Sequence, residues 1–169
     1  FFAGVQQKFF GWPNLYTPFG FNETEDLRTT LYTFNHRAWT SPENFCQLGA
    51  YYRRNDDDYE FNRAVPGASN PFIHTTQVRA LALDGHQLFG DYAVTYGAQA
   101  MRDSLQSTAL TFGRFRTRDY YKVSIVPERE FATTSGRLRL RAGIAYDDTN
   151  RDDSALSPIL EAVLTRPDS

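Results

Sequence analysis

Hydrophobic and polar residues alternate along much of the chain, and a period of two predicts β-strands. The clearest example runs from Arg137 to Asp147, where Leu, Ile and Tyr alternate with Arg, Gly and Asp. Successive side chains of a strand point to opposite faces, so this strand has one apolar face and one cationic face. Clear strands are also expected over 46–53, 92–101 and 120–125, and weaker ones over about 2–9, 25–38, 75–84 and 157–165.

The links between these strands alternate between long and short. Short links are expected at 39–44, 85–90 and 132–136, and long links at 10–23, 55–74, 103–117 and 147–156. In an up-and-down antiparallel sheet, this order places the long loops at one end and the tight turns at the other. Outer-membrane barrels show this asymmetry, and strands of about ten residues can cross a bilayer when tilted. The sequence therefore predicts an all-β, antiparallel up-and-down meander of about eight strands.

The alternation also fits a soluble sheet whose cationic face lies in water. A soluble carbohydrate-binding module of this kind would bury Leu138, Leu140 and Ile144 under a second sheet. Tyrosines near the expected strand ends favour the membrane version, because aromatic girdles lie at both interfaces of a membrane barrel. These tyrosines are Tyr52, Tyr92, Tyr121 and Tyr146.

Composition narrows the possible functions. The 169 residues include 18 Lys and Arg against 20 Asp and Glu, a net charge of -2 that provides no basic surface for nucleic acid. The single cysteine, Cys46, excludes an internal disulfide. The chain begins at Phe1 without a signal peptide, so we expect a processed product or part of a longer protein.

Motifs for covalent chemistry are missing from the sequence. It contains no Gly-x-Ser-x-Gly elbow and no Gly-rich phosphate loop. His36, His74 and His86 are far apart and lack metal-ligand spacing. We therefore do not expect an enzyme.

Several segments resemble the barrel region of TonB-dependent outer-membrane receptors, and the resemblance covers essentially residues 1–169. The segments are FFGWPNLYTPF at 9–19, NETE at 22–25, YRRNDDDYEFNR at 52–63 with Pro66-Gly67, STALTFGRF at 107–115, DYYK at 119–122 and AYDDTNR at 145–151.

This resemblance implies a location in the bacterial outer membrane and a plugged barrel of about 22 strands. The chain would then be an incomplete segment of a transmembrane β-barrel, without the plug or the closing aromatic strand. The receptor would bind a scarce solute, such as a siderophore or a corrinoid, and import it. Its partners would be this small-molecule ligand, the plug domain of the same receptor and outer-membrane lipid. The TonB complex would be contacted only through the missing N-terminal region. The alternative is a complete eight-stranded barrel with a structural or adhesion role, in which the first strand pairs with the last.

Aromatic residues are the first candidates for ligand binding. Trp12, Tyr16 and Phe19 lie in an aromatic segment with several turn formers, and Tyr59 lies in the next long link. Their rings could stack on an extracellular ligand, or they could pack on neighbouring loops or mark the membrane interface. The sequence leaves both interpretations open.

Charged residues are the second group of candidates. The row Arg137, Arg139 and Arg141, like the row at 114, 116 and 118, could draw an anionic ligand into the lumen or form ion pairs with Glu128, Glu130 and Asp119. Asp56, Asp57 and Asp58, with Asp148 and Asp152-Asp153, form two expected acidic loops that could bind calcium or remain solvated. No other cofactor is expected.

Overall fold

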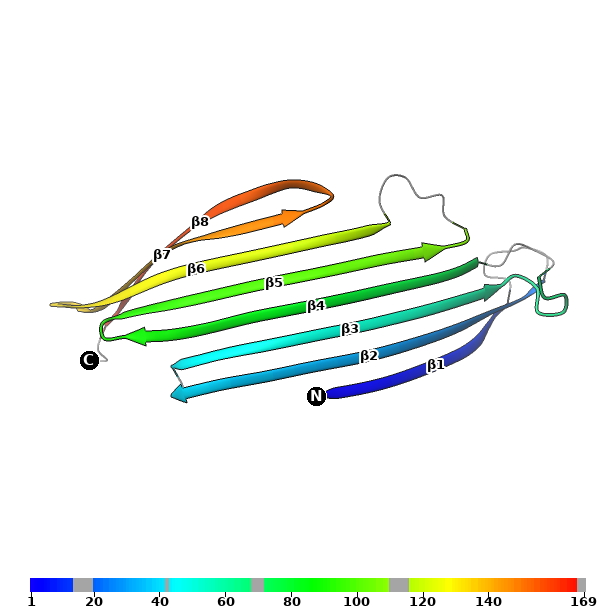
Figure 1. The fold of residues 1–169 in the computed structure, drawn as a ribbon, viewed down its shortest axis with the longest axis horizontal. Helices are drawn as coiled ribbons and strands as arrows, with labels where there is room; N and C mark the ends of the chain where they lie inside the picture. The colour runs from blue at the N-terminus through cyan, green and yellow to red at the C-terminus, as the bar shows by residue number, and fades with distance from the viewer. Residues whose placement is uncertain (14–19, 42, 68–71, 110–115, 167–169) are drawn as a thin grey trace. The chain divides into compact units, whose positions relative to one another are not determined.

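The computed structural model describes residues 1–169 except 14–19, 42, 68–71, 110–115 and 167–169. The described chain is all-β, and its eight strands form one sheet in the order β1 to β8 (Figure 1). The strands are β1 (Phe2–Pro13), β2 (Asn22–Ser41), β3 (Asn44–Glu60), β4 (Phe72–Phe89), β5 (Tyr92–Ser107), β6 (Thr117–Thr133), β7 (Gly136–Thr149) and β8 (Asp152–Thr165). The predicted antiparallel up-and-down meander is confirmed.

No helix in the described part of the chain is long and apolar enough to span a membrane. The chain divides into two compact units, and the division cuts across β2 to β6. The first contains residues 1–34, 51–79 and 102–118, and the second contains 35–50, 80–101 and 119–169.

The lengths of the links follow the prediction with one exception. Short links separate β2 from β3, β4 from β5, and β6 from β7, and long links follow β1, β3 and β5. Gly90, with φ 66°, supplies the left-handed backbone that the tight β4–β5 turn uses. The long link predicted at 147–156 is wrong: β7 continues to Thr149 and β8 begins at Asp152. Asp147 pairs with Ala155 and Asp152 pairs with Thr149, so these acidic residues lie in a hairpin and not in the predicted loop.

In the second unit, the strand register places the apolar residues of β6, β7 and β8 on one face. Ile125 lies opposite Ile144, which lies opposite Pro158. Tyr146 pairs with both Val123 and Leu156 in the same way. We call this surface the apolar face. Its side chains are exposed, with Ile144 at 50% and Leu160 at 81%.

The opposite surface of the second unit, which we call the polar face, carries most of the charged residues of the same strands. Arg141, for example, pairs with Glu128 on β6 and Glu161 on β8. Arg129 is an exception, since it lies opposite Leu140 on the apolar face, with its guanidinium over the Tyr92 ring. The close approach of β6 and β7 depends on Gly143, because a Cβ atom there would lie 2.3 Å from the carbonyl oxygen of Ile125. Among the described residues, the buried hydrophobic side chains are Ala93, Val126 and Ala145 alone. The second unit therefore buries little apolar surface of its own.

On β3 to β7, the apolar run ends at a charged residue where the strand approaches the end that bears the long links. Along β3, Tyr52 is followed by Arg54 on the same side, and along β7, Tyr146 is followed by Asp148. On β4, β5 and β6 the boundary residues are Arg79, Arg102 and Asp119. The apolar runs of β5, β7 and β8 are about nine residues long, the length of a tilted transmembrane strand, and Arg129 interrupts the run of β6.

Candidate functional site

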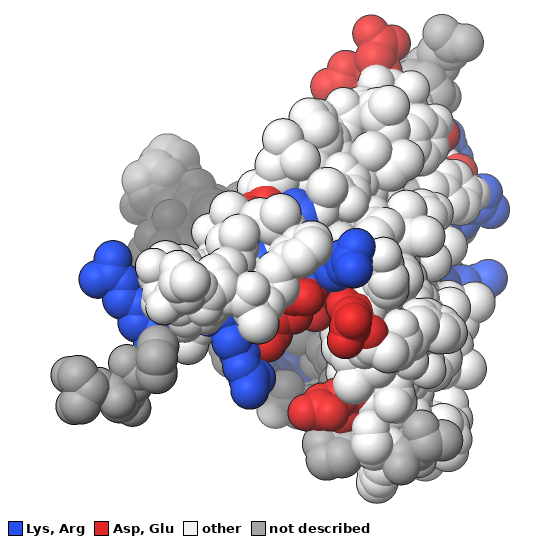
Figure 2. Space-filling model, turned by 90° about the vertical axis from the view of Figure 1, so that its left-hand side faces the viewer, with Lys and Arg blue, Asp and Glu red and all other residues white. Residues whose placement is uncertain are grey.

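The arginine row of β7 lies on the polar face of the second unit, and two of its three members form ion pairs across strands. Arg137 Nη1 lies 3.3 Å from Glu130 Oε1, with both side chains well exposed. Arg141 Nη1 lies 2.9 Å from Glu161 Oε2, and its Nε lies 3.3 Å from Glu128 Oε2. Figure 2 shows acidic and basic side chains gathered close together, beside broad areas without charge. Ion pairing, one of the two interpretations of this row, is thus observed for Arg137 and Arg141.

Arg139 has an exposed side chain and forms no ion pair with a described residue. Glu128 has a further neighbour, since His86 Nε2 lies 3.6 Å from its Oε1. Glu128, on β6, thus has one neighbour on β4 and another on β7. In the second arginine row, Arg118 pairs with Asp103 at 2.6 Å. Residue 114 of that row lies outside the described residues.

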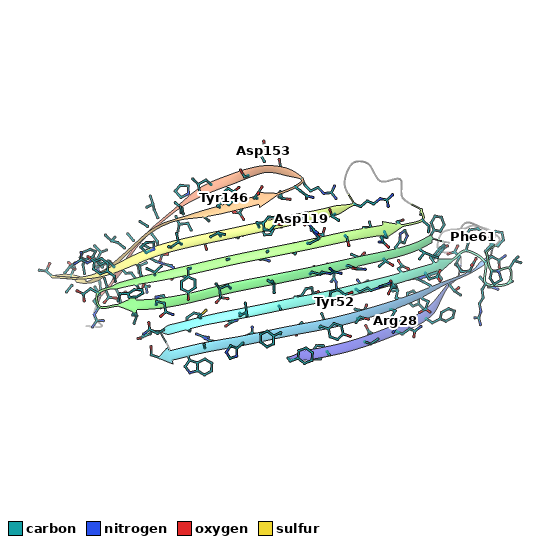
Figure 3. All side chains as sticks on the ribbon, in the orientation of Figure 1. Arg28, Tyr52, Phe61, Asp119, Tyr146 and Asp153 are labelled. Atoms are coloured by element: carbon teal, nitrogen blue, oxygen red, sulfur yellow. The ribbon has the colours of Figure 1, made fainter. Side chains whose placement is uncertain are left out.

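A pocket in the first unit collects aromatic and acidic side chains. It has a volume of about 500 Å³ and is lined by Glu25, Asp57, Tyr59, Phe61, Phe72 and His74. The lining residues come from β2, β3, β4 and the segment that follows β3, where Figure 3 labels Phe61. We call it the aromatic–acidic pocket.

The pocket forms because alternate residues of neighbouring strands point to the same side. Asp57, Tyr59 and Phe61 are two residues apart in sequence, so an extended chain presents them together. The Tyr59 and Phe72 rings lie with centroids 5.7 Å apart and a tilt of 52°. Phe61 contacts Phe21 at 4.8 Å between centroids, which supports it from a third segment.

The three consecutive aspartates lie in β3, and the prediction that they form a loop is wrong. Because side chains alternate along a strand, Asp57 points into the pocket and Asp56 and Asp58 point to the other side. The triplet therefore does not converge on one cation. Among the residues that the structure describes, no group of three or more His, Cys, Asp and Glu side chains is placed to hold a metal ion.

The pKa values of Asp56 and Asp57 shift in opposite directions although the residues are adjacent, and both residues lie beyond the apolar run that ends at Tyr52. The pKa of Asp56 is lowered, chiefly because Arg54 donates hydrogen bonds of 2.8 to 3.0 Å to its carboxylate. Thr75 donates another, and the positive charge of Arg28, labelled in Figure 3, acts in the same direction. Burial raises the pKa of Asp57, and the neighbouring Glu25 carboxylate raises it further.

The other predicted aromatic residues have mixed outcomes. Trp12 lies in β1, and its indole Nε1 donates a hydrogen bond of 2.5 Å to Glu25, a lining residue of the pocket. Tyr59 lines the pocket itself. Tyr16 and Phe19 lie outside the described residues.

Sequence reasoning missed four lining residues of the pocket as site residues: Glu25, Phe61, Phe72 and His74. Alternation showed which neighbours on one strand share a side, but it could not show which strands would present those sides together. That information is in the pairing of β2, β3 and β4.

The fold defines the chain as an antiparallel eight-stranded meander. Comparisons of the chain with protein-family models, with curated proteins and with solved structures found no match.

We expect the Glu128→Gln substitution to lower the free energy of unfolding by about 1–2 kcal/mol, because it leaves Arg141 without one of its charged partners in a half-buried position. Glu130→Gln is the matched control, since it breaks a pair with Arg137 that is 77% and 48% exposed. The control should change stability by less than about 0.5 kcal/mol. Urea-induced unfolding followed by tryptophan fluorescence measures the stability of both variants. Equal losses of stability would contradict the conclusion that the Glu128–Arg141 pair stabilises the fold more than the Glu130–Arg137 pair.

We expect Asp56→Asn and Asp57→Asn to change thermal stability in opposite directions at neutral pH. The folded pKa of Asp56 is lowered, so its contribution is present above the unfolded value of about 3.9 and is lost as the pH falls through the folded pKa. The folded pKa of Asp57 is raised, so its favourable contribution is present at low pH and is lost as the pH rises through that pKa. Asp57→Asn should therefore raise the melting temperature at pH 7, and Asp56→Asn should lower it.

The Asp57→Asn difference should shrink at pH 3, where the wild-type Asp57 carboxyl binds a proton, and the Asp56→Asn difference should shrink only as the pH falls through the lowered pKa of Asp56. Differential scanning fluorimetry at the two pH values provides the measurement. Shifts of the same sign for both variants at pH 7 would show that the two carboxyls do not differ in environment as described.

Proposed function

We propose that the chain forms part of the barrel wall of a TonB-dependent outer-membrane receptor, which binds a scarce solute such as a siderophore or a corrinoid and imports it. The exposed apolar face carries the proposal. Hydrocarbon is the environment in which such a face is stable while the opposite face remains polar. Membrane strands show this inversion of the usual soluble pattern.

The boundaries of the apolar runs support the same proposal. Tyr52, Tyr121 and Tyr146 stand at one boundary and Tyr92 at the other, as tyrosines of interfacial girdles do. Charged residues follow immediately on the side of the long links. The polar face would line the lumen, where ion pairs such as Arg141–Glu161 would remain hydrated or contact a plug.

A soluble carbohydrate-binding module is less well supported. It would cover Leu140 and Ile144 with a second sheet, and both are exposed to 41% and 50% in the described chain. A complete eight-stranded barrel with a structural or adhesion role is the alternative. In the observed sheet order, β1 and β8 each neighbour a single strand, which favours a wall that continues into further strands.

A pair of labelled cysteines tests the membrane orientation. In a Cys46→Ser background reconstituted in lipid vesicles, a fluorophore on Leu140→Cys should be quenched by brominated lipid. The same fluorophore on Arg139→Cys, the adjacent control on the other face, should be quenched by aqueous iodide. A probe at position 140 that only iodide reaches would rule out the bilayer, and one that neither reaches would support a covering sheet.

Uptake assays test the proposed transport. Deletion of the gene in the source bacterium should reduce the uptake of a labelled ferric siderophore or corrinoid to the level seen in cells without TonB. Complementation with the intact gene should restore uptake. Unchanged uptake of such solutes, together with loss of surface adhesion, would favour the alternative role.

A further inference from the structure

We propose that the aromatic–acidic pocket binds an organic ammonium cation. This inference adds a substrate class to the proposed uptake function, and it depends on that function only for the statement that the bound cation is imported. The binding itself is argued from the charge, the aromatic lining and the size of the pocket.

The pocket presents negative charge to whatever enters it. Glu25 and Asp57 line it, no Lys or Arg is among its described lining residues, and His74 is the one lining side chain that can become cationic. Glu25 is held in place by the indole of Trp12. Oδ1 of Asp57 is buried and has no hydrogen-bond partner among the described residues. A buried acceptor without a partner is costly, and a cationic N–H group or an ammonium charge would offset that cost.

Aromatic rings complete the wall. Tyr59, Phe61 and Phe72 line the pocket, and the Tyr59 and Phe72 rings meet at a tilt of 52°. The faces of aromatic rings are electronegative, so they attract a cation within about 6 Å of the ring centre. Rings combined with carboxylates favour a cation that also carries apolar substituents, as alkylammonium groups do.

The size of the pocket argues against a bare metal ion. Its volume of about 500 Å³ exceeds the space that a single cation needs. The Asp, Glu and His side chains of the described chain are also not arranged as a metal cluster. An anion would be repelled by Glu25 and Asp57. An alkylammonium ion fits the charge, the rings and the volume together.

Choline and its neutral isostere 3,3-dimethylbutan-1-ol form a matched pair of probes. The test uses the full-length protein as the cell produces it, purified in detergent. We expect choline to bind saturably to this protein and the isostere to bind about tenfold more weakly. Isothermal titration calorimetry measures both. Equal affinity for the two probes, or no binding of choline, would overturn the proposal.

Three substitutions locate the site. Asp57→Asn should weaken choline binding about tenfold, and Phe72→Leu, which keeps an apolar side chain but removes the ring, should weaken it about threefold. Asp58→Asn is the matched control, because it removes the adjacent, exposed carboxylate on the other side of β3. An equal loss for Asp57→Asn and Asp58→Asn would show that general surface charge attracts choline and that the pocket does not.

The expected stabilisation of Asp57→Asn at pH 7 separates lost binding from lost folding, since a more stable variant that binds less has lost a ligand contact. Uptake assays separate the two proposals. Choline binding without solute import would leave the pocket assigned and reject the receptor function. Import of the solute without choline binding would support the receptor function and reject the assignment of the pocket.

Discussion

The apolar face of the second unit has no covering within the described chain, and the other features of the structure follow from this constraint. Backbone hydrogen bonds between neighbouring strands satisfy the main chain, but they do not remove Leu160 or Ile144 from the solvent. A water-soluble sheet hides such a face against a second layer. The buried hydrophobic residues among the described ones, Ala93, Val126 and Ala145, are small. In the proposed outer-membrane location, lipid would provide the second layer.

The same constraint explains the chemistry of the opposite face. Because the apolar side chains gather on one face of the second unit, the other face of each strand is available for charged groups. Glu128, Arg141 and Glu161 occupy such positions on three consecutive strands, and they compensate one another. Charge balance on this face therefore comes from pairing between strands.

In the first unit, the carboxylates that line the pocket are not paired with an Arg or Lys among the described residues. Glu25 and Asp57 are brought side by side without an Arg or Lys between them, and aromatic rings surround them. Burial, followed by the charge of the neighbouring Glu25, raises the pKa of Asp57, so the ionised carboxylate of Asp57 works against stability at neutral pH. Proteins commonly retain unfavourable charge where a ligand later compensates it. The difference between the compensated network and the uncompensated pocket is the main reason to place binding in the first unit.

The alternation of residues by itself determined the fold class, the eight strands and the two faces of β7, because the period of side chains in a strand depends only on local geometry. It also determined three of the long links and all three of the short ones. It could not locate the β7–β8 hairpin, because an acidic run such as Asp147-Asp148 is equally suited to a loop and to a strand whose partner is unknown. The sequence pattern predicted a loop for Asp56 to Asp58 for the same reason.

Only the tertiary structure decided which side chains meet. The register of β6, β7 and β8 selected Glu128 and Glu161 as partners of Arg141, although the sequence offered several carboxylates. The pairing of β2, β3 and β4 brought Glu25, Asp57 and His74 into one pocket from segments far apart in the chain. Such contacts depend on long-range strand register, and a shift of one residue would turn each of these side chains to the other face.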